Sequence, residues 1–222
     1  MKSVKKSLFL AGCLLALASA CAPKAGQLQT GDLVFVGIPA GYDLDSDSMD
    51  SAIADATGDP DGITLIHTAI LDMTGGEPWI IDATIRRGVD RHPLDTFVRD
   101  FTLKDGSLPV FLVKRLKDDR RAEEFVDNAR HFQGLPYDVS FLPDNDAYYC
   151  TELVYDSYLA PDGTPLFHAA PMNFKNADGE FPLYWEQLFA RIGQEIPQGI
   201  PGTNPQAMAE ESILRPVNVP LY

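Results

Sequence analysis

Runs of apolar residues of strand length recur through the first half of the chain. Three of them are β-branched and bounded by glycine, proline or polar residues, which is typical of strands: Leu33–Ile38, Ile63–Leu71 and Trp79–Ile85. A fourth run, Leu108–Val113, carries a proline near its start, where a missing N–H group is tolerated. The second and third runs are close enough in the sequence to form an antiparallel hairpin.

Apolar residues at helical spacing predict the helices. One helix runs over Phe125–Phe132, where Asp118 or Asp119 offers a cap and Gly134 closes it; another begins near Cys150. The other expected elements are a short helix over Met49–Ala54, a helix at Pro182–Gly193 and a last strand at Ser212–Val217. Strands in the first half and helices around them predict an α+β fold, with an antiparallel sheet packed against the helix that carries the cysteine.

The predicted hairpin places a histidine beside an aspartate. With a turn at residues 74–75, His67 lies directly opposite Asp82; with a turn at 75–76, it faces Thr84 and Asp82 lies diagonally on the same face. In both registers a carboxylate can hold the imidazole in one tautomer and stabilise its charged form, as the third residue of a catalytic triad does.

Cys150 is the candidate nucleophile. Residues 144–146 offer helix caps just upstream, so Cys150 is expected in the first turn, where unpaired N–H groups and the helix dipole lower a thiol pKa from about 8.5 toward neutrality. The alternative is that Cys150 is a small buried hydrophobic residue. Together with His67 and Asp82 it would provide a nucleophile, a base and an orienting residue.

The first twenty residues read as a targeting segment. A basic start is followed by the apolar run Leu8–Ala18 and by Leu17–Cys21, which resembles a bacterial lipobox with Cys21 as the lipidated residue. Leu10–Cys13 also fits the lipobox pattern but leaves almost no apolar run before it, and a plain signal peptide with a chance cysteine is the other alternative. We expect residues 1–20 to be a lipoprotein signal peptide, 21–29 a lipidated tether, and 30–222 a single domain.

The net charge and the cysteine content of the chain indicate where the protein is located and which partners it can bind. Loss of residues 1–20 removes three lysines and no acidic residue, so the net charge falls from −14 to −17, which disfavours nucleic acid and anionic membrane surfaces. The lipid anchor is then the only membrane contact expected. Ala22 is not the aspartate associated with inner-membrane retention, so we expect an outer-membrane lipoprotein facing the periplasm. Cys150 is the one thiol left in the mature domain and has no disulfide partner.

Neither a metal nor a cofactor is predicted. His92, His131 and His168 stand alone, without the paired spacing of zinc ligands, and are interpreted as surface or core residues. The acidic segment after Asp43 lacks the glycine and the final glutamate of a calcium loop. Glu152, in the first turn of the cysteine helix, is interpreted as complementing the helix dipole.

Several short segments, in this order, are similar to the YiiX/YebB-like branch of the NlpC superfamily of circularly permuted papain-like cysteine hydrolases. They are Leu28–Phe35, Ile66–Ile70, Trp79–Ala83, Tyr149–Val154 and the tail segment Ile196–Gly202. The histidine and the acid precede the cysteine here, whereas in ordinary papain-like enzymes the cysteine comes first. The resemblance implies that Cys150 is the nucleophile, His67 the general base and Asp82 the orienting residue. Asp82 stands where glutamate is frequent and Thr151 where serine is frequent.

The sequence therefore predicts a lipid-anchored envelope cysteine hydrolase that forms an acyl-enzyme. The expected substrate is a peptidoglycan stem-peptide amide. Two other classes stay open: an acyltransferase or lipid amidase that acts on an acyl amide with the same three residues, and a non-catalytic envelope binding module. The sequence does not define the oligomeric state.

Overall fold

The fold is described from a computed structural model, which covers residues 27–58 and 62–221. Within these residues, six antiparallel strands form one sheet in the order β4-β3-β2-β1-β5-β8. Their bounds are Leu33–Ile38 (β1), Thr64–Asp72 (β2), Trp79–Thr84 (β3), Gly88–Pro93 (β4), Val110–Leu116 (β5) and Leu214–Pro216 (β8). A separate pair of two-residue strands, β6 (Ala170–Pro171) and β7 (Pro201–Gly202), ties two loops together.

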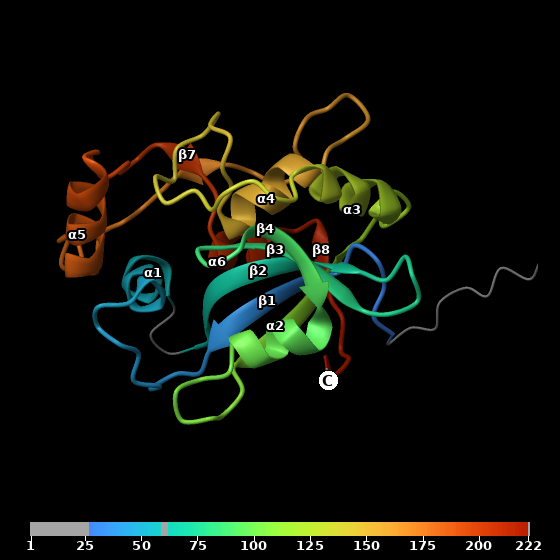
Figure 1. Ribbon diagram of the computed structural model, residues 1–222, viewed down its shortest axis with the longest axis horizontal. Coiled ribbons are helices and arrows are strands. Elements are labelled where there is room, and N and C mark those ends of the chain that lie inside the picture. The colour runs from blue at the N-terminus through green and yellow to red at the C-terminus, as the bar shows by residue number, and fades with distance from the viewer. Residues whose placement is uncertain (1–26, 59–61, 222) are drawn as a thin grey trace, which may run out of the picture.

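Six helices of the described chain surround the sheet (Figure 1). They are α1 (Met49–Thr57), α2 (Leu94–Asp100), α3 (Ala122–His131), α4 (Cys150–Ser157), α5 (Leu183–Ile192) and α6 (Pro205–Glu210). In Figure 1, α3 and α4 cover one face of the sheet and α2 crosses the other face, while α1 and α5 lie together beyond the ends of the strands.

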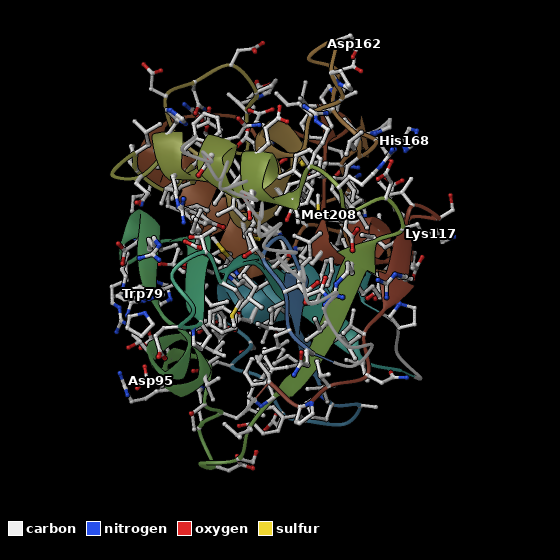
Figure 2. The ribbon with its side chains drawn as sticks, turned by 90° about the vertical axis from the view of Figure 1, so that its right-hand side faces the viewer. Trp79, Asp95, Lys117, Asp162, His168 and Met208 are labelled. Carbon is white, nitrogen blue, oxygen red and sulfur yellow. The ribbon has the colours of Figure 1, made fainter. Side chains whose placement is uncertain are left out.

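Each face of the sheet has its own apolar core. On the α3/α4 face, Phe35 and Ile81 pack with Val126, Leu153 and Met208. Figure 2 shows Met208 in the interior, between the sheet and the helices, whereas Asp95 of α2 and Asp162 lie at opposite outer surfaces. Because a second core covers the α2 face as well, both faces of the central strands are buried, and their sequences are nearly continuous apolar runs.

The second core, on the α2 face, combines Val34, Leu71 and Ile80 of the strands with Leu94 and Phe97 of α2. A third, aromatic cluster joins α5 and α1 to the residue that precedes α4, through Trp185, Phe189, Ala52 and Tyr149. Helix α4 thus lies between the sheet and this third cluster.

The predicted strands and helices are present, with ends that differ by a few residues. The cap predictions, however, are wrong. Helix α3 begins after Arg121 without a side-chain cap bond in the described chain, and Asp118 instead accepts hydrogen bonds from Arg120. Helix α4 begins after Tyr149, and Asn145 accepts from the Ala147 N–H before the helix starts. The chain turns at Asp144, whose φ is +60°, before α4 starts.

Strand β4 and helix α2 have no counterpart in the prediction, and neither do the short elements β6, β7 and α6. Strand β4 pairs with β3 along its full length, from Trp79 opposite Pro93 to Thr84 opposite Gly88. Its sequence, with Asp90, Arg91 and His92 in succession, lacks an apolar alternation because β4 is an edge strand. Helix α2 follows Pro93 directly, and its Phe97 is fully buried beneath the sheet.

Asp32 does more than turn the chain. Its carboxylate accepts the Gln29 N–H at 2.9 Å, as a turn residue does, but it also pairs with Arg115 of β5, with Nη2 to Oδ2 at 2.7 Å. Both side chains are buried. A buried pair of this kind gives little net stability, but removal of one partner leaves the other charge unpaired in the core.

We expect Arg115→Met to lower the free energy of unfolding by about 3–5 kcal/mol, because it leaves the Asp32 carboxylate buried and unpaired. Chemical denaturation followed by circular dichroism measures the change. The matched control is Arg120→Met, which breaks the exposed pair with Asp118 and should leave the denaturation midpoint unchanged. Equal midpoints for the Arg115→Met variant and the wild type would contradict this assignment.

Candidate active site

The β2–β3 hairpin brings the predicted histidine and aspartate into contact. Strands β2 and β3 pair from Ile70 opposite Ile81 to Asp72 opposite Trp79, which is the register that places Asp82 diagonally from His67. His67 and Asp82 lie just beyond these paired residues of β2 and β3. His67 Nε2 and Asp82 Oδ2 are 2.9 Å apart, so the aspartate side chain is long enough to bond the imidazole.

An irregularity in β2 sets the direction of the His67 side chain. The pairing of β1 with β2 shifts between Val36, opposite His67, and Gly37, opposite Leu65, so Ile66 is an extra residue in β2. Bulges of this kind re-aim a side chain. The imidazole packs against the rings of α2 and its C-terminal end, with its centroid 4.7 Å from that of Phe101, and its side chain is almost fully buried. Aromatic packing therefore restricts the ring orientation.

Cys150 is the first residue of α4, as predicted, and it is 6% exposed. The preceding residue holds the start of the helix in place: the Glu152 carboxylate accepts the Tyr149 N–H at 3.4 Å, and the Tyr149 hydroxyl accepts the Thr203 N–H at 3.1 Å. The sulfur thus lies at the end of the helix where free backbone N–H groups favour negative charge.

The pKa of His67 is raised by interactions with both Cys150 and Asp82. Burial by itself lowers the pKa of the imidazole, but the negative charge of Cys150, hydrogen bonds with Asp82 and Cys150, and the charge of Asp82 outweigh it and raise the pKa to about 10. The imidazole of His67 consequently holds its proton at neutral pH, between the Cys150 sulfur and the Asp82 carboxylate.

This coupling predicts a pH dependence of stability. The pKa of His67 is higher in the folded protein than its ordinary value of 6.5, so the stability that its protonation contributes is fully present below pH 6.5 and is lost as pH rises toward about 10. We expect the wild type to have a higher Tm than His67→Gln at pH 6 and this difference to shrink by pH 10. Differential scanning calorimetry of both proteins at the two pH values measures it. A Tm difference that widens with pH would show that the sign is wrong.

The segment 136–138 brings the phenol side chain of Tyr137 to the same site. Tyr148 donates its N–H to the Pro136 carbonyl at 3.0 Å, and Asp138 donates to the Tyr148 carbonyl at 3.1 Å, so this segment runs beside the residues that lead to Cys150. Burial, followed by the charge of Cys150, raises the pKa of Tyr137 well above its ordinary value. Tyr137 is therefore a neutral hydrogen-bond donor near the sulfur.

An apolar pocket opens beside the cysteine. It extends between α1, the start of α4 and the loops that precede α5 and α6. Its lining within the described chain contains no Asp, Glu, Lys or Arg, and its large side chains are apolar or aromatic: Ile53, Ile66, Tyr137, Phe141, Tyr149, Met172, Phe174 and Trp185. The pocket can accept an apolar group attached to a carbonyl at Cys150.

The sequence analysis did not identify Tyr137 or the pocket. Trp185 and Phe189 are four residues apart and predict a buried helix face, but no local pattern shows that this face meets the cysteine helix. Met172 and Phe174 lie in a loop held by the β6–β7 pair and have no periodicity. These contacts join segments far apart in the sequence, so only the fold reveals them.

Some predictions fall outside the described residues. The signal peptide 1–20, Cys21 and most of the tether lie there. Within residues 27–58 and 62–221, no helix is both long and apolar enough to cross a membrane. The same residues contain no group of three or more His, Cys, Asp or Glu side chains that could hold a metal ion.

Comparisons with known proteins find a family and two relatives that the chain resembles. A family model described as "permuted papain-like amidase enzyme, YaeF/YiiX, C92 family" matches residues 27–218. The uncharacterized protein YiiX of Escherichia coli strain K12 is 26% identical over 187 residues, which cover 83% of each chain. The crystal structure of metalloprotein yiiX from Escherichia coli O157:H7 aligns with a TM-score of 0.64 and 25% identity over 85% of this chain and 96% of that one. Both the α+β fold and the resemblance predicted from the sequence are confirmed.

Proposed function

The chain belongs to the C92 family of permuted papain-like amidases and is a cysteine hydrolase, and we propose that it cleaves an amide bond through Cys150, His67 and Asp82. The observation that carries the proposal is the 2.9 Å contact between His67 and Asp82, next to a cysteine at a helix N-terminus. A nucleophile, a base and an orienting carboxylate at one site are the requirements of covalent acyl transfer.

In the proposed reaction, the thiol proton of Cys150 has passed to His67 before the substrate binds, and the Cys150 sulfur attacks the amide carbonyl. The C–N bond of the tetrahedral intermediate then breaks as the His67 imidazolium gives its proton to the leaving amine, which leaves a thioester on Cys150. Water attacks the thioester while His67 accepts one of its protons, and the carboxylic acid leaves as the C–S bond breaks, which restores the Cys150 thiolate beside the protonated His67. Asp82 keeps the imidazole oriented through both steps.

The oxyanion of each tetrahedral intermediate needs hydrogen-bond donors. The backbone N–H of Cys150 is one, because the first N–H groups of a helix have no partner within the helix. We assign the second to the hydroxyl of Tyr137, a neutral phenol that the charge of Cys150 affects directly. Within the described chain this hydroxyl donates to a weak acceptor, Met49 Sδ at 3.6 Å, so a stronger acceptor can replace that contact.

Two amide substrates fit the envelope location that we propose on the basis of the lipobox at Cys21. One is a peptidoglycan stem peptide. The other is an acyl amide with an apolar acyl chain, and the pocket beside Cys150 specifically supports it, because its lining in the described residues offers no charged side chain to a peptide carboxylate. The same acyl-enzyme could also pass its acyl group to an acceptor other than water, as an acyltransferase does.

A competition between substrates tests this function. The soluble protein that starts after Cys21 is incubated with N-acyl amides of increasing chain length and, separately, with muropeptides, and the adduct on Cys150 is identified by mass spectrometry after acid quench. We expect a thioester with an apolar acyl group. A peptidyl thioester would favour the stem peptide, and the absence of any adduct or product with both panels would contradict the hydrolase mechanism at this site.

A substitution that narrows the pocket tests whether the acyl chain of the substrate binds there. Ala56→Phe adds a ring to the pocket wall that α1 contributes and leaves the three catalytic candidates unchanged in sequence. We expect KM for long acyl amides to rise about tenfold, corresponding to the lost burial of roughly two methylene groups, while alkylation of Cys150 by iodoacetamide stays unchanged. An unchanged KM would show that the acyl chain binds elsewhere.

The related protein from Escherichia coli O157:H7 is described as a metalloprotein. In the described part of this chain the histidine, cysteine and acidic side chains do not gather into a group that could hold a metal ion. No step of the proposed reaction uses a metal.

A further inference from the structure

A second histidine lies behind the catalytic aspartate. His92 belongs to β4, the edge strand beside β3, and is 5% exposed. Because Asp82 is opposite Asp90 and Ile80 is opposite His92, the side chains of His92 and Asp82 emerge on the same face of the sheet. Its ring stacks on Phe97 at 6.4 Å, which is one of the rings that also contacts His67. His92 was expected from the sequence to be a surface or core residue without a chemical role.

The polar atoms of His92 and Asp82 are unpaired on the sides that face each other. Asp82 bonds His67 through Oδ2, but its Oδ1 is buried without a hydrogen-bond partner among the described residues, and so are both ring nitrogens of His92. The distance from His92 Nδ1 to Asp82 Oδ1 is 3.8 Å. Buried polar groups are rarely left unpaired, and this donor and acceptor need an approach of only about 1 Å to form a normal hydrogen bond.

We propose that His92 is a positioning residue for the hydrolase reaction: its Nδ1–H bonds Asp82 Oδ1, so that the carboxylate is held between two imidazoles. The inference rests on the proposed function of Cys150, His67 and Asp82, and extends that chain of contacts by one residue. His92 touches neither the thiol nor the substrate. It acts by fixing the plane of the Asp82 carboxylate, which in turn fixes the His67 ring.

The alternative partner of His92 is Asp90, whose Oδ2 lies 3.6 Å from Nδ1. Asp90 is half exposed and already lies 3.7 Å from the Arg87 guanidinium, so water and Arg87 can satisfy its oxygens. The unpaired oxygen of Asp82 is fully buried, and His92 is the histidine that faces it. Leaving the buried Asp82 oxygen without a hydrogen bond costs more free energy than leaving the half-exposed Asp90 without one, so Asp82 is the partner that we assign to His92. The titratable and charged groups around His92 are therefore Asp82, Asp90, Arg87 and, across Asp82, His67.

Three variants test the role, with a readout that does not require a known substrate. His92→Leu removes the donor, His92→Asn keeps an amide N–H close to the position of Nδ1, and Asp90→Asn removes the competing charge. The rate of Cys150 alkylation by iodoacetamide is measured from pH 5.5 to 9, together with kcat and KM once a substrate is available. We expect His92→Leu to lower alkylation at pH 6.5 and kcat about tenfold each with little change in KM, and His92→Asn and Asp90→Asn to stay near the wild type.

Each other outcome has a definite meaning. If His92→Leu matches the wild type, or if His92→Asn is as impaired as His92→Leu, the hydrogen bond has no positioning role. If Asp90→Asn reproduces the loss, the partner is Asp90 and the inference is wrong. If the wild-type thiol itself shows no enhanced reactivity at pH 6.5, the proposed function fails and this inference fails with it. If the wild-type thiol is reactive and His92→Leu does not change its reactivity, this inference alone fails.

A measurement on the wild type keeps the inference testable even if the leucine variant does not fold. Long-range ¹H–¹⁵N correlation spectra of the histidine side chains report which ring nitrogen carries the proton. We expect His92 to carry it on Nδ1 at pH 7.5. A proton on Nε2 with a bare Nδ1 would overturn the proposed bond to Asp82.

Discussion

Replacement of Cys150 by serine is expected to reduce amide hydrolysis on the order of 10⁴-fold or more, because loss of the nucleophile leaves only binding and oxyanion stabilisation. Serine is close in size to cysteine, so the pocket and the start of α4 keep their shape. The hydroxyl, however, is far less acidic than a thiol, and a histidine that is arranged to pair with a thiolate does not activate it. Product formation under saturating substrate measures the effect.

The fold of the Cys150→Ser variant provides the control. Cys150 is buried against the sheet, so circular dichroism and Tm should stay close to those of the wild type. A folded serine variant with more than a few per cent of the wild-type rate would show that the reaction does not proceed through the sulfur. A non-catalytic binding module would instead show no amide hydrolysis in either protein, and the serine variant would keep its binding, because such a module does not need the thiol.

Asp82→Asn is expected to have the second largest effect, a loss of about 10³–10⁴-fold in kcat. The amide can keep the distance to His67 but presents either an N–H group or an uncharged oxygen to Nε2. An N–H group favours the wrong tautomer of the imidazole, and an uncharged oxygen no longer stabilises the imidazolium. Because Asp82 is 1% exposed, water cannot replace the lost charge.

Asp72→Asn is the matched control, because Asp72 is an equally buried carboxylate near the same hairpin. Burial opposes its ionisation, but hydrogen bonds from Arg130 and Arg91 hold the pKa of Asp72 well below its ordinary range. We expect this variant to lose stability and to keep its kcat. If both asparagine variants lowered kcat equally, the effect of Asp82→Asn would reflect general destabilisation, and its orienting role would be contradicted.

The sequence was informative where the contacts are local. His67 and Asp82 are only 15 residues apart in the β2–β3 hairpin, so the alternating pattern and the glycine turn were enough to place them on one face. They did not decide between two registers. The turn bond joins the Gly76 N–H to the Met73 carbonyl, as a turn at residues 74–75 would, yet the ladder follows the other register because the connection contains additional unpaired residues.

Contacts between distant segments could not be read from the sequence. The pocket beside Cys150 combines α1 with loops more than one hundred residues further along the chain. Asp32 follows a glycine just before a strand, which is typical of a turn, and nothing near it in the sequence shows that Arg115 will reach it in the core. His92 illustrates the same limit, because its proximity to Asp82 follows from the pairing of β3 with an edge strand that has no apolar signature.

The fold explains how His67 and Asp82, which come first in the chain, meet a cysteine that comes much later. Strand β2 is central in the sheet, and its extra residue at Ile66 aims His67 toward the site. Helix α4 lies against β2 and β3, so its N-terminus is held at the point where the hairpin ladder ends. Strand order and helix packing bring the three residues together independently of their order along the chain.

The most direct test of the central claim is the rate of Cys150 alkylation as a function of pH in the soluble protein that starts after Cys21, measured side by side with His67→Ala. We predict a wild-type thiol that reacts rapidly at pH 6–7, where an ordinary thiol with a pKa of about 8.5 is mostly protonated, and a loss of that reactivity in the variant. Slow reaction in both proteins, with a midpoint near 8.5, would contradict a Cys150–His67 ion pair and favour a binding module.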